Sequence, residues 1–301
     1  MSNGCCAYGN SICYGASVSP PKPPAPRRNS SGLGRDIEVL ETLGLPEALQ
    51  AGGLGVVRIA ELTGREKTVI SRTLATLADA GLVARDPESL GYRLGPRLFA
   101  LAARTSEAVL VREARPYLRR IARHTGETAH LSVLRGGNVL TLVSELSPYE
   151  FRTAGWEGVT TAAWRTPSGR VLLSDWDDEE LEAWYEQHGH DKPMVGPGRT
   201  DHTSAFTVLD APPPEHVVVR DLRDLKLEIA RVRERGYAIS DEELEVGVVA
   251  ASAPVTDFTG RVVAAVNVSA PKARMPGSLD TIGEFVARAT EPLSAHLGAR
   301  L

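Results

Sequence analysis

The segment "REKTVISRTLATLADAGLVARD", residues 65–86, constrains the fold more than any other stretch of this 301-residue chain. Ile70, Leu74 and Leu77 recur at the i, i+4 and i+7 spacing of one helical face, so that face requires a core to pack against. The opposite face carries short hydroxyl side chains and one guanidinium, that of Arg72. We therefore expect a helix that packs on one side and presents a shallow polar surface on the other.

The segments around this helix have the order of a winged helix-turn-helix domain. A first helix is predicted from the spacing of Ile37, Leu40 and Leu43, and a short second helix ends at Gly64, where a left-handed C-cap residue belongs. After the polar-faced helix stops at Gly81, "LVARDPESLGYRLG" is typical of two strands joined by a turn. Helix, short helix, turn, helix and β-hairpin together predict a DNA-binding fold.

The polar face of the main helix has a shape suited to the major groove of DNA. That groove is about 12 Å wide, and short side chains reach bases or phosphates without holding the helix backbone away. An arginine there has the length for a phosphate or a guanine edge, and arginines on both arms of the hairpin would flank the neighbouring backbone. The residues predicted to contact DNA are Thr68, Val69, Ser71, Arg72, Thr76, Arg85 and Arg93. One alternative is a three-helix interaction module whose polar face is merely solvated. Another is a metabolite-binding module whose winged domain contacts protein and not DNA.

Charge divides the chain into two unequal parts. Residues 1–123 hold 17 Lys and Arg against 11 Asp and Glu, a net +6, whereas residues 124–301 hold 17 against 27, a net −10. The first part is therefore the one suited to a polyanion such as DNA. The alternative is a chance asymmetry between two solvated surfaces.

The N-terminal segment is expected to be an unstructured tail. Cys5, Cys6 and Cys13 are the three cysteines of the chain, and a Pro/Ser-rich stretch follows them, so a disulfide framework is excluded and a metal site lacks a nearby fourth ligand. No apolar run reaches the ~18 residues that cross a bilayer, and the first residues lack a basic region followed by an apolar one. We therefore expect a cytoplasmic protein with no membrane partner.

Residue types that could support catalysis occur in patterns that favour structural or solvated roles. The stretch "HGHDKPMVGPGRTDHT", residues 188–203, has the composition of a Gly/Pro-rich loop and no metal-ligand spacing. His130 lies on an apolar strand and is interpreted as a hydrogen-bonded core residue, while the acidic runs at 175–182 and 242–245 are interpreted as solvated helix starts. The chain has no Walker loop, G-x-S-x-G or complete dinucleotide fingerprint. We expect no enzyme activity, cofactor or metal; a hydrolase with an accessory winged domain is the least favoured alternative.

The rest of the chain predicts an α+β domain joined to the first through a helix. Apolar residues from Leu98 to Leu110 predict a connecting helix over 97–114 that could hold a dimer, with Pro116 opening the next element. Two hairpins follow, one in "ETAHLSVLRGGNVLTLVSEL" and one in "GVVAASAPVTDFTGRVVAAVNVSAP". Helices predicted in "DLKLEIARVRERG" and "SLDTIGEFVARATEPLSAHL" complete a sensor-type domain.

The stretch "RIAELTGREKTVISRTLATLADAGLVARDPESLGYRLGPRL" resembles the DNA-binding domain of IclR-type bacterial transcriptional regulators. That family's pattern runs through Lys-Ser-Thr-Val, an Arg, G-L-V-x-R-D and Y-x-L-G. Lys67, Thr68 and Arg72 fall on its Lys, hydroxyl and Arg positions, so the resemblance adds Lys67 to the residues expected at DNA. The chain departs from the pattern at Arg65 and Glu66, which replace Leu-Pro, and a carboxylate there would mildly repel phosphate.

The resemblance extends over most of the second half. "TPSGRVLLS", "RERGYAISDEELEVGVVAASAPV" and "VNVSAP" are similar to three segments of the family's C-terminal domain. This implies a GAF-like effector domain with a pocket for a small metabolite. The family's ligand-contacting positions fall here on Pro167, Ser168, Ser240, Val248, Ala250, Asn267 and Ser269.

The residues at these positions are suited to a carboxylate. Ser240, Asn267 and Ser269 can all hydrogen-bond one, and Pro167 and Ser168 are expected to precede a helix whose free N–H groups favour an anion. Ser240 stands where some members have Asp, and an alanine stands where some have Cys, so the particular ligand of those members does not carry over.

Together these inferences predict a ligand-responsive transcriptional regulator. Its expected partners are double-stranded DNA, a small carboxylate-bearing effector and further copies of itself in a homodimer or tetramer. The expected organisation is an unstructured tail at 1–32, a winged helix-turn-helix domain at 33–96, a connecting and dimerisation helix at 97–114 and a GAF-like mixed α/β effector domain at 115–301. The fold class is α+β.

Overall fold

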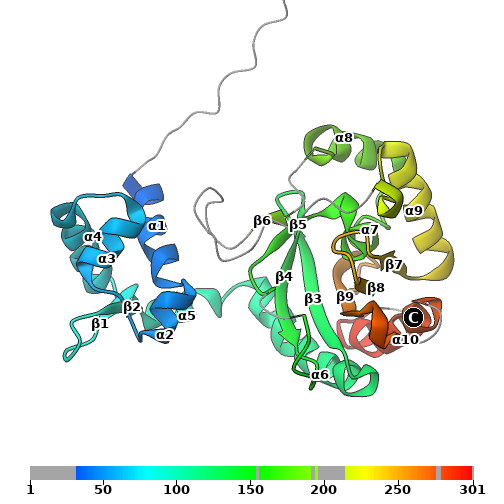
Figure 1. Cartoon of the computed structure of the whole chain (residues 1–301). Helices are drawn as coiled ribbons and strands as arrows, with labels where there is room; N and C mark the ends of the chain where they lie inside the picture. The colour runs from blue at the N-terminus through cyan, green and yellow to red at the C-terminus, as the bar shows by residue number, and fades with distance from the viewer. Residues whose placement is uncertain (1–31, 154–155, 191–193, 196–213, 276–278, 300–301) are drawn as a thin grey trace, which may run out of the picture.

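The structure consists of a small helical domain followed by a larger domain built on a sheet, as Figure 1 shows. It is a computed structural model, and it describes residues 32–153, 156–190, 194–195, 214–275 and 279–299. The three cysteines and the tail predicted at the N-terminus lie outside the described residues, apart from Gly32, the first residue of the first helix.

The small domain contains four helices and a two-stranded hairpin. Its elements are α1 (Gly32–Leu43), α2 (Pro46–Gln50), α3 (Val56–Thr63), α4 (Lys67–Asp79), β1 (Val83–Arg85) and β2 (Tyr92–Leu94). The two strands pair antiparallel, and Leu54 forms a bridge with Tyr92 that ties the segment before α3 to the hairpin. This is the predicted winged helix-turn-helix order.

The core of the small domain lies between α1, α3 and α4. Ile59, Ile70 and Leu74 are completely buried in it, which confirms the predicted inner face of α4. Gly64 ends α3 with φ +61°, the left-handed conformation predicted for it. The prediction for α1 was wrong in part: Val39 faces the core and Ile37 is 44% exposed, because the helix presents its i, i+4 pair Val39 and Leu43 to the core.

The predicted connecting helix is two helices in the structure. They are α5 (Pro96–Ala102) and α6 (Ser106–Thr125), and α6 begins at the N-cap Thr105, whose side chain accepts a hydrogen bond from the Ala108 N–H. Pro116 lies inside α6 and does not open a new element, so that prediction was wrong. The buried row Ala114, Leu118 and Ile121 packs against the sheet and holds the helix together past the proline.

The larger domain is built on a seven-stranded antiparallel sheet. Its strands are β3 (Thr128–Arg135), β4 (Asn138–Glu145), β5 (Thr160–Ala162), β6 (Met194–Val195), β7 (Ala238–Asp241), β8 (Val248–Thr256) and β9 (Val262–Pro271). They lie in the order β6-β5-β4-β3-β9-β8-β7, so the two predicted hairpins β3–β4 and β8–β9 are joined along β3 and β9.

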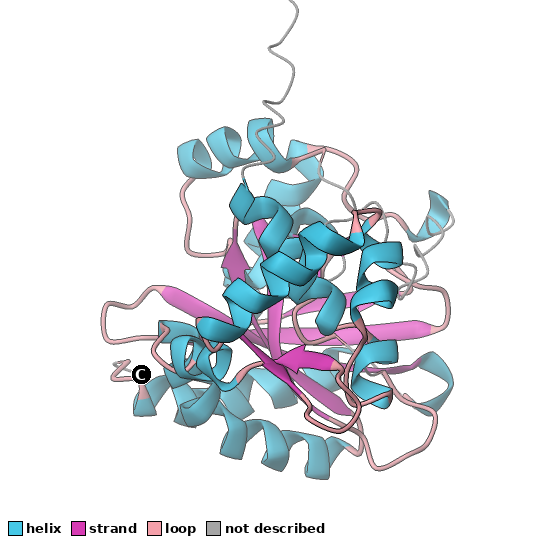
Figure 2. Ribbon diagram, turned by 90° about the vertical axis from the view of Figure 1, so that its left-hand side faces the viewer, coloured by secondary structure: helices cyan, strands magenta, loops and turns pink. Residues whose placement is uncertain are grey.

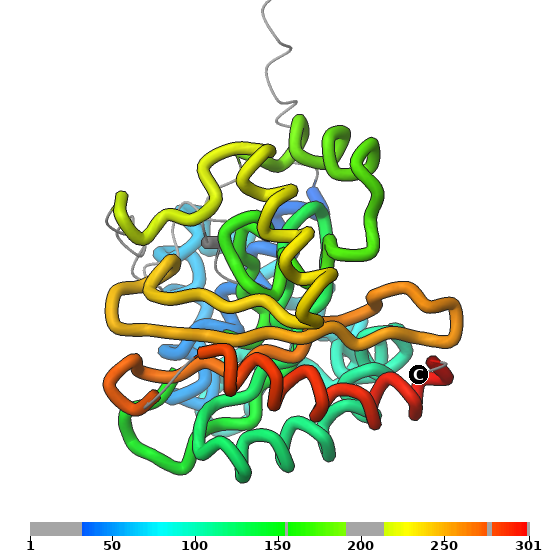
Figure 3. Tube along the Cα trace, turned by 90° about the vertical axis from the view of Figure 1, so that its right-hand side faces the viewer, coloured from blue at the N-terminus to red at the C-terminus, as the bar shows by residue number. Residues whose placement is uncertain are grey.

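Helices cover both faces of this sheet. On one face lie α6 and α10 (Leu279–His296); on the other lie α7 (Pro167–Leu172), α8 (Asp178–His188) and α9 (Leu222–Arg235). Short 3-10 turns span Ala163–Arg165, Pro214–His216 and Lys272–Arg274. Figure 2 shows the sheet between the helical layers, and in Figure 3 the β8–β9 hairpin runs between α9 above and α10 below.

Each face of the sheet has its own apolar core. One core packs α6 and α10 against residues such as Leu131, Val266 and Val268, and the other packs α7, α8 and α9 against Val139 and Ala265. The chain therefore has the predicted α+β architecture. Among the described residues, no helix combines the length and the apolar character needed to cross a membrane.

Candidate functional site

The outer face of α4 is exposed and carries two uncompensated charges. All eight residues predicted to contact DNA are exposed. The side chains of Lys67 and Arg72 form no hydrogen bond or ion pair with any described residue, while Ile70 and Leu74 on the opposite face fix the helix to the core. The two cations are therefore free to meet an external anion such as a phosphate.

Other predicted residues of this surface are held by contacts within the domain. The Thr76 hydroxyl donates to the Arg72 carbonyl at 3.1 Å, so its proton is engaged within α4. On the wing, Arg85 donates to the Leu90 carbonyl at 3.4 Å, and its guanidinium lies 5.4 Å from the centre of the Tyr92 ring. The wing arginine is thus oriented by its own hairpin.

The start of α4 differs from a well-capped helix. Glu66 is the N-cap residue, is exposed and makes no side-chain capping hydrogen bond. The wing turn is better satisfied, because Asp86 accepts hydrogen bonds from the backbone N–H groups of Glu88 and Ser89. These bonds, that of Ser89 first, hold the pKa of Asp86 below its usual range. The wing turn is therefore fixed by side-chain hydrogen bonds that the start of α4 lacks.

A second candidate site is a cavity of about 80 Å³ in the larger domain, between the sheet and α7. All seven residues predicted to contact an effector line it. The lining consists of His130, Ser132, Val139, Thr141, Thr153, Trp156, Thr161, Thr166, Pro167, Ser168, Ser240, Leu244, Val248, Ala250, Asn267 and Ser269. These residues come from strands of the sheet, from α7 and from the segments that follow β4 and β7.

The strand alternation explains why so many polar side chains meet in one place. Successive residues of a strand point to opposite faces, and in β9 Val266 and Val268 enter the α6–α10 core while Asn267 and Ser269 face the cavity. The register then aligns the polar residues across strands, with His130 opposite Asn267. Ser240 and Ser269 likewise lie on either side of a β8 residue, Ala250.

His130 lies at the centre of a chain of hydroxyl groups. Its Nδ1 is 2.9 Å from the Ser144 Oγ, its Nε2 is 2.9 Å from the Ser269 Oγ, and that oxygen is 2.8 Å from the Thr153 Oγ1. The side chain is 5% exposed, and burial lowers its pKa from 6.5 to about 4 although the nearby charge of Glu157 opposes the shift. The ring is therefore neutral near pH 7.

The floor of the cavity contains an acceptor without a donor. The Asn267 Oδ1 is buried and has no hydrogen-bond partner in the described part of the chain. By contrast, the Ser252 hydroxyl beneath the cavity is bonded to the Val266 carbonyl at 3.1 Å and lies 3.3 Å from the Ser168 Oγ. A buried amide oxygen without a donor is a position where a ligand N–H or O–H would be favourable.

The beginning of α7 differs from the expectation. Pro167 and Ser168 are the first two residues of the helix and do not precede it, and the N-cap Thr166 accepts the Gly169 N–H at 3.1 Å. Proline has no N–H to offer, so fewer free donors remain than predicted. Gly169 is required here, because a Cβ would lie 2.0 Å from the Ala163 carbonyl oxygen.

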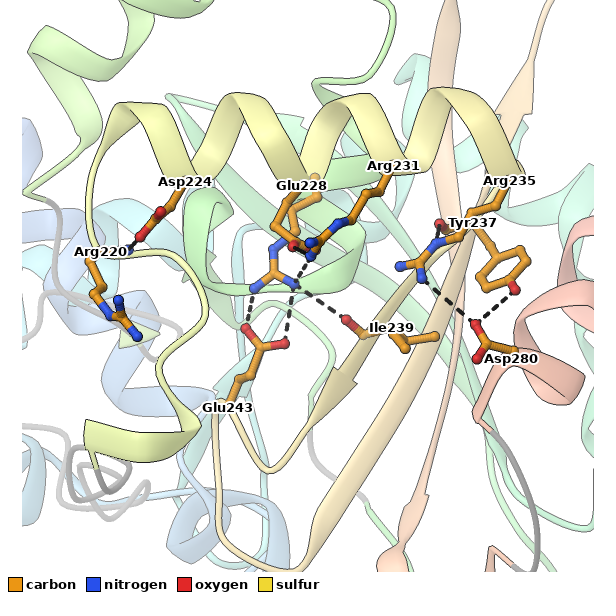
Figure 4. Close-up of polar contacts among 10 residues, drawn as sticks. Arg220, Asp224, Glu228, Arg231, Arg235, Tyr237, Ile239, Glu243 and Asp280 are labelled. Carbon is orange, nitrogen blue, oxygen red and sulfur yellow. Dashed lines mark hydrogen bonds and ion pairs between the residues drawn. The ribbon is translucent and has the colours of Figure 1, made fainter.

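An ion pair beneath the cavity fastens α7 to the loop after β7. Arg170 is completely buried and forms two hydrogen bonds with the Glu243 carboxylate, one of them at 3.1 Å, and one with the Ile239 carbonyl at 3.3 Å. The Glu228 carboxylate of α9 lies 3.8 Å from the Arg170 guanidinium and also pairs with Arg231; Figure 4 shows Glu228 on the helix above and Glu243 on the loop below. Ser168 and Leu244, close to the pair in sequence, line the cavity.

The Arg170–Glu243 ion pair shows that the interpretation of the acidic residues 242–245 was wrong. Residues 242–245 were expected to start a solvated helix, but they form a turn between β7 and β8, and Glu243 is 6% exposed. The physical reason is the buried guanidinium that it neutralises. The other run does start a helix, since Asp177 and Glu180 form a capping box at the start of α8.

The histidine-rich stretch lies mostly outside the described residues. His188 ends α8 and His190 is exposed, whereas Asp191, Asp201 and His202 are not described. Within the described part of the chain, no three His, Cys, Asp or Glu side chains are grouped so that they could hold a metal ion.

The sequence interpretation missed several lining residues, of which His130 is the most informative. It was assigned to the core, and its hydrogen bonds agree with that, but it also faces the cavity. The signal was present in "ETAHLSVL", where Thr128, His130 and Ser132 alternate with apolar residues. Thr153 and Trp156 gave no such signal, because they lie in an irregular segment.

Comparison with known proteins agrees with this architecture. The helix-turn-helix domain of IclR regulators matches residues 37–87, and the C-terminal domain of bacterial IclR transcriptional regulators matches residues 102–211 and 214–295. A winged helix-turn-helix followed by such a domain defines the class of DNA-binding transcriptional regulators with a C-terminal effector domain. Within that class, the chain belongs to the IclR family. The matched families are regulators and not enzymes.

Individual relatives span nearly the whole chain. The chain is 28% identical to the transcriptional regulator BhcR of Paracoccus denitrificans over 288 residues, 91% of this chain and 94% of that protein. It is 29% identical to KdgR of Escherichia coli over 86% of this chain and 92% of that protein. Among solved structures, an IclR regulator from Alicyclobacillus acidocaldarius has a TM-score of 0.63 at 26% identity and covers 88% of this chain, 96% of its own.

A further solved structure shows the same fold with a ligand named in its description. It is an IclR homologue from Microbacterium hydrocarbonoxydans complexed with 4-hydroxybenzoate, with a TM-score of 0.67 at 21% identity. The two chains align over 89% of this one and 99% of that one. At this identity the likeness concerns the fold.

Proposed function

We propose that this regulator binds an operator through α4 and the wing, and that a small carboxylate-bearing metabolite in the cavity controls that binding. The observation that carries the proposal is the cavity itself, in which seven residues taken from a family pattern are all part of one lining. The operator contacts are assigned to Lys67, Thr68, Val69, Ser71, Arg72, Thr76, Arg85 and Arg93.

The charges on α4 support a DNA-binding surface. Lys67 and Arg72 are exposed and have no partner among the described residues, and nothing bulky separates them, because Thr68 and Ser71 are short. A helix in the major groove needs short side chains near the bases and cations near the phosphates. Both requirements are met on one face of a helix that is fixed by its buried residues.

The lining of the cavity supports a small polar ligand. Hydroxyl groups from Ser240, Ser269 and Thr166 surround it, and Asn267 provides an amide. The cavity, at about 80 Å³, is smaller than an engineered 150 Å³ cavity that holds benzene, so it suits a molecule more compact than an aromatic acid. The relative crystallised with 4-hydroxybenzoate makes a carboxylic acid a reasonable first probe.

Exposed apolar residues support the proposed homodimer or tetramer. On α5, Phe99 is 79% exposed and Leu101 is 50% exposed. Exposed apolar surface marks a protein–protein contact when it forms a contiguous patch, and these two side chains are close together on α5. A dimer would place two winged domains on half-sites about one helical turn of DNA apart, or a multiple of that spacing.

A mobility-shift assay tests the proposal directly. The duplex is the DNA upstream of the protein's own gene and its neighbours, and the assay is repeated with a panel of small carboxylic acids. The proposal expects a salt-dependent shift that at least one acid strengthens or weakens. A protein that binds no upstream duplex, or whose binding no acid changes, would contradict it.

A further inference from the structure

The described residues that line the cavity include none with a permanent positive charge. Among the described residues that line it there is no lysine or arginine, and His130 is the only ionisable side chain. A buried guanidinium beneath the cavity, that of Arg170, is engaged by Glu243. Among the described residues that line the cavity, His130 is therefore the one side chain that can become a counter-charge for an anion.

We propose that His130 is the counter-ion of an acidic effector and that it takes up one proton from solvent when the effector binds. The empty cavity then contains a neutral imidazole, and the complex contains an imidazolium and a carboxylate. This inference rests on the proposed function, because it requires that the effector enters this cavity. It adds a charge-compensating role to a residue that otherwise belongs to the core.

The hydrogen bonds of the ring permit both protonation states. A neutral imidazole donates from one nitrogen and accepts at the other, whereas an imidazolium donates from both. Each nitrogen of His130 faces a hydroxyl oxygen, at Ser144 and Ser269, and a hydroxyl group can donate or accept. Protonation therefore rotates hydroxyl groups and requires no movement of the strands.

The rotation also changes what the cavity offers. When both ring nitrogens donate, the Ser269 oxygen accepts from Nε2, and its own proton is free to point at Thr153 or at the ligand. Ser269 lines the cavity, so protonation of His130 presents an O–H donor to the carboxylate. The charge of the protonated His130 ring and the O–H donor of Ser269 therefore both favour a bound carboxylate.

The charged groups around the ring agree with this assignment. From the segment after β4, Glu157 faces His130 and accepts the Ser144 N–H at 3.1 Å; its charge favours a protonated ring. On β4 itself, Glu145 pairs with arginines of α6 on the other side of the sheet. The β9 neighbours of the ring, Asn267 and Ser269, are uncharged. Burial is the opposing effect, and it keeps the pKa near 4 in the empty cavity.

Calorimetry on the full-length protein tests the proposal. Acetate and pyruvate are titrated at pH 5.5 to 7.5 in buffers of different ionisation enthalpy, with acetamide and pyruvamide as neutral matches. Below the pKa of His130 in the complex, one proton should be taken up per bound acid and the association constant should fall by about tenfold per pH unit. Above that pKa the uptake should vanish and the constant should level off. The amides should bind without proton uptake.

A variant of His130 shows whether the histidine or the bound acid takes up the proton. His130→Gln keeps a polar side chain that cannot become charged, and exposed His124→Gln is the matched control. Proton uptake should vanish in His130→Gln and persist in His124→Gln. Uptake that persists in His130→Gln would mean that the ligand carries the proton, and this would overturn the proposal.

The wild-type measurement stands even if the variant does not fold. Acid binding with no proton uptake, or with a pH-independent constant, overturns the role of His130 and leaves the proposed function intact. A panel in which no acid and no amide binds counts against the effector cavity itself. The two failures are therefore distinguishable.

Discussion

At the scale of single residues, burial and pairing separate the side chains that hold the fold from those available for contact. Ile70 and Arg72 are two positions apart on α4, yet one is completely buried and the other is exposed, with a guanidinium that pairs with no described residue. Periodicity predicted that division from sequence. It could not assign His130, because strand alternation shows which face a residue lies on and not whether a cavity is present there.

Replacement of Arg72 by alanine should weaken operator binding and leave the fold unchanged. The side chain makes no contact that the fold needs, and a bidentate arginine–base contact contributes about 1 to 3 kcal/mol. Fluorescence anisotropy with a labelled operator measures the effect. Arg223→Ala, an exposed arginine on α9, is the control and should bind as the wild type does. Equal affinity of Arg72→Ala and wild type would rule out this face of α4.

His130 should make the larger domain sensitive to acid. Its folded pKa of about 4 lies below the ordinary 6.5, so the unfolded chain binds the proton more tightly. Its contribution to the free energy of unfolding is complete above about pH 6.5. About 3 kcal/mol of stability is lost as the pH falls from there towards 4. All four tryptophans lie between residues 156 and 184, so their fluorescence in urea follows this domain.

The comparison for this pH prediction is His130→Gln. Between pH 6.5 and pH 4, the free energy of unfolding of wild type and of the exposed-histidine variant His124→Gln should fall by the contribution of His130. The free energy of unfolding of His130→Gln should not show this part of the fall. An identical slope in all three proteins would show that other groups cause the acid sensitivity.

At the scale of elements, the sequence predicted the order of helices and strands better than their ends. Caps and glycines located α3, α4 and the two hairpins, because those signals are local. The break between α5 and α6 and the passage of α6 through Pro116 depend on packing against the sheet, which no local pattern reveals. The turn at 242–245 was misjudged for the same reason, since its partner Arg170 is far away in sequence.

Loss of the Arg170 side chain should strongly destabilise the larger domain. Arg170→Ala leaves the buried Glu243 carboxylate without its cation and leaves Glu228 paired with Arg231 alone, and breaking a buried pair in this way costs about 3 to 5 kcal/mol. Arg261→Ala is the control, because its pair with Asp175 is half exposed and contributes at most about 1 kcal/mol. Urea unfolding followed by tryptophan fluorescence compares them; similar losses in both variants would contradict a structural role for the buried pair.

At the scale of the whole molecule, a winged domain is joined through α5 and α6 to an acidic domain with a cavity. The charge division was readable from the sequence, and so was the family pattern that located seven of the lining residues. The cavity itself was not, because its lining comes from segments that are far apart in the sequence. Two predictions belong to this scale.

Operator binding should depend steeply on salt. If a dimer neutralises six to ten phosphates, the logarithm of the binding constant falls against log[salt] with a slope of roughly −0.9 per phosphate. Lys67→Ala should reduce the magnitude of that slope by about one for each phosphate contact removed. A slope near zero in the wild type would mean that the duplex is not held through its backbone.

The central claim is that the cavity controls DNA binding, and the double variant Asn267→Ala/Ser269→Ala tests it most directly. Operator affinity is measured by anisotropy with and without the acid that wild type responds to. Coupling between the two sites of wild type is expected at about 1 to 3 kcal/mol, roughly 5- to 150-fold in affinity. The double variant should bind ligand-free operator nearly as wild type does and should no longer respond to the acid. A response of wild-type size, or an equal loss of operator binding with and without the acid, would contradict it.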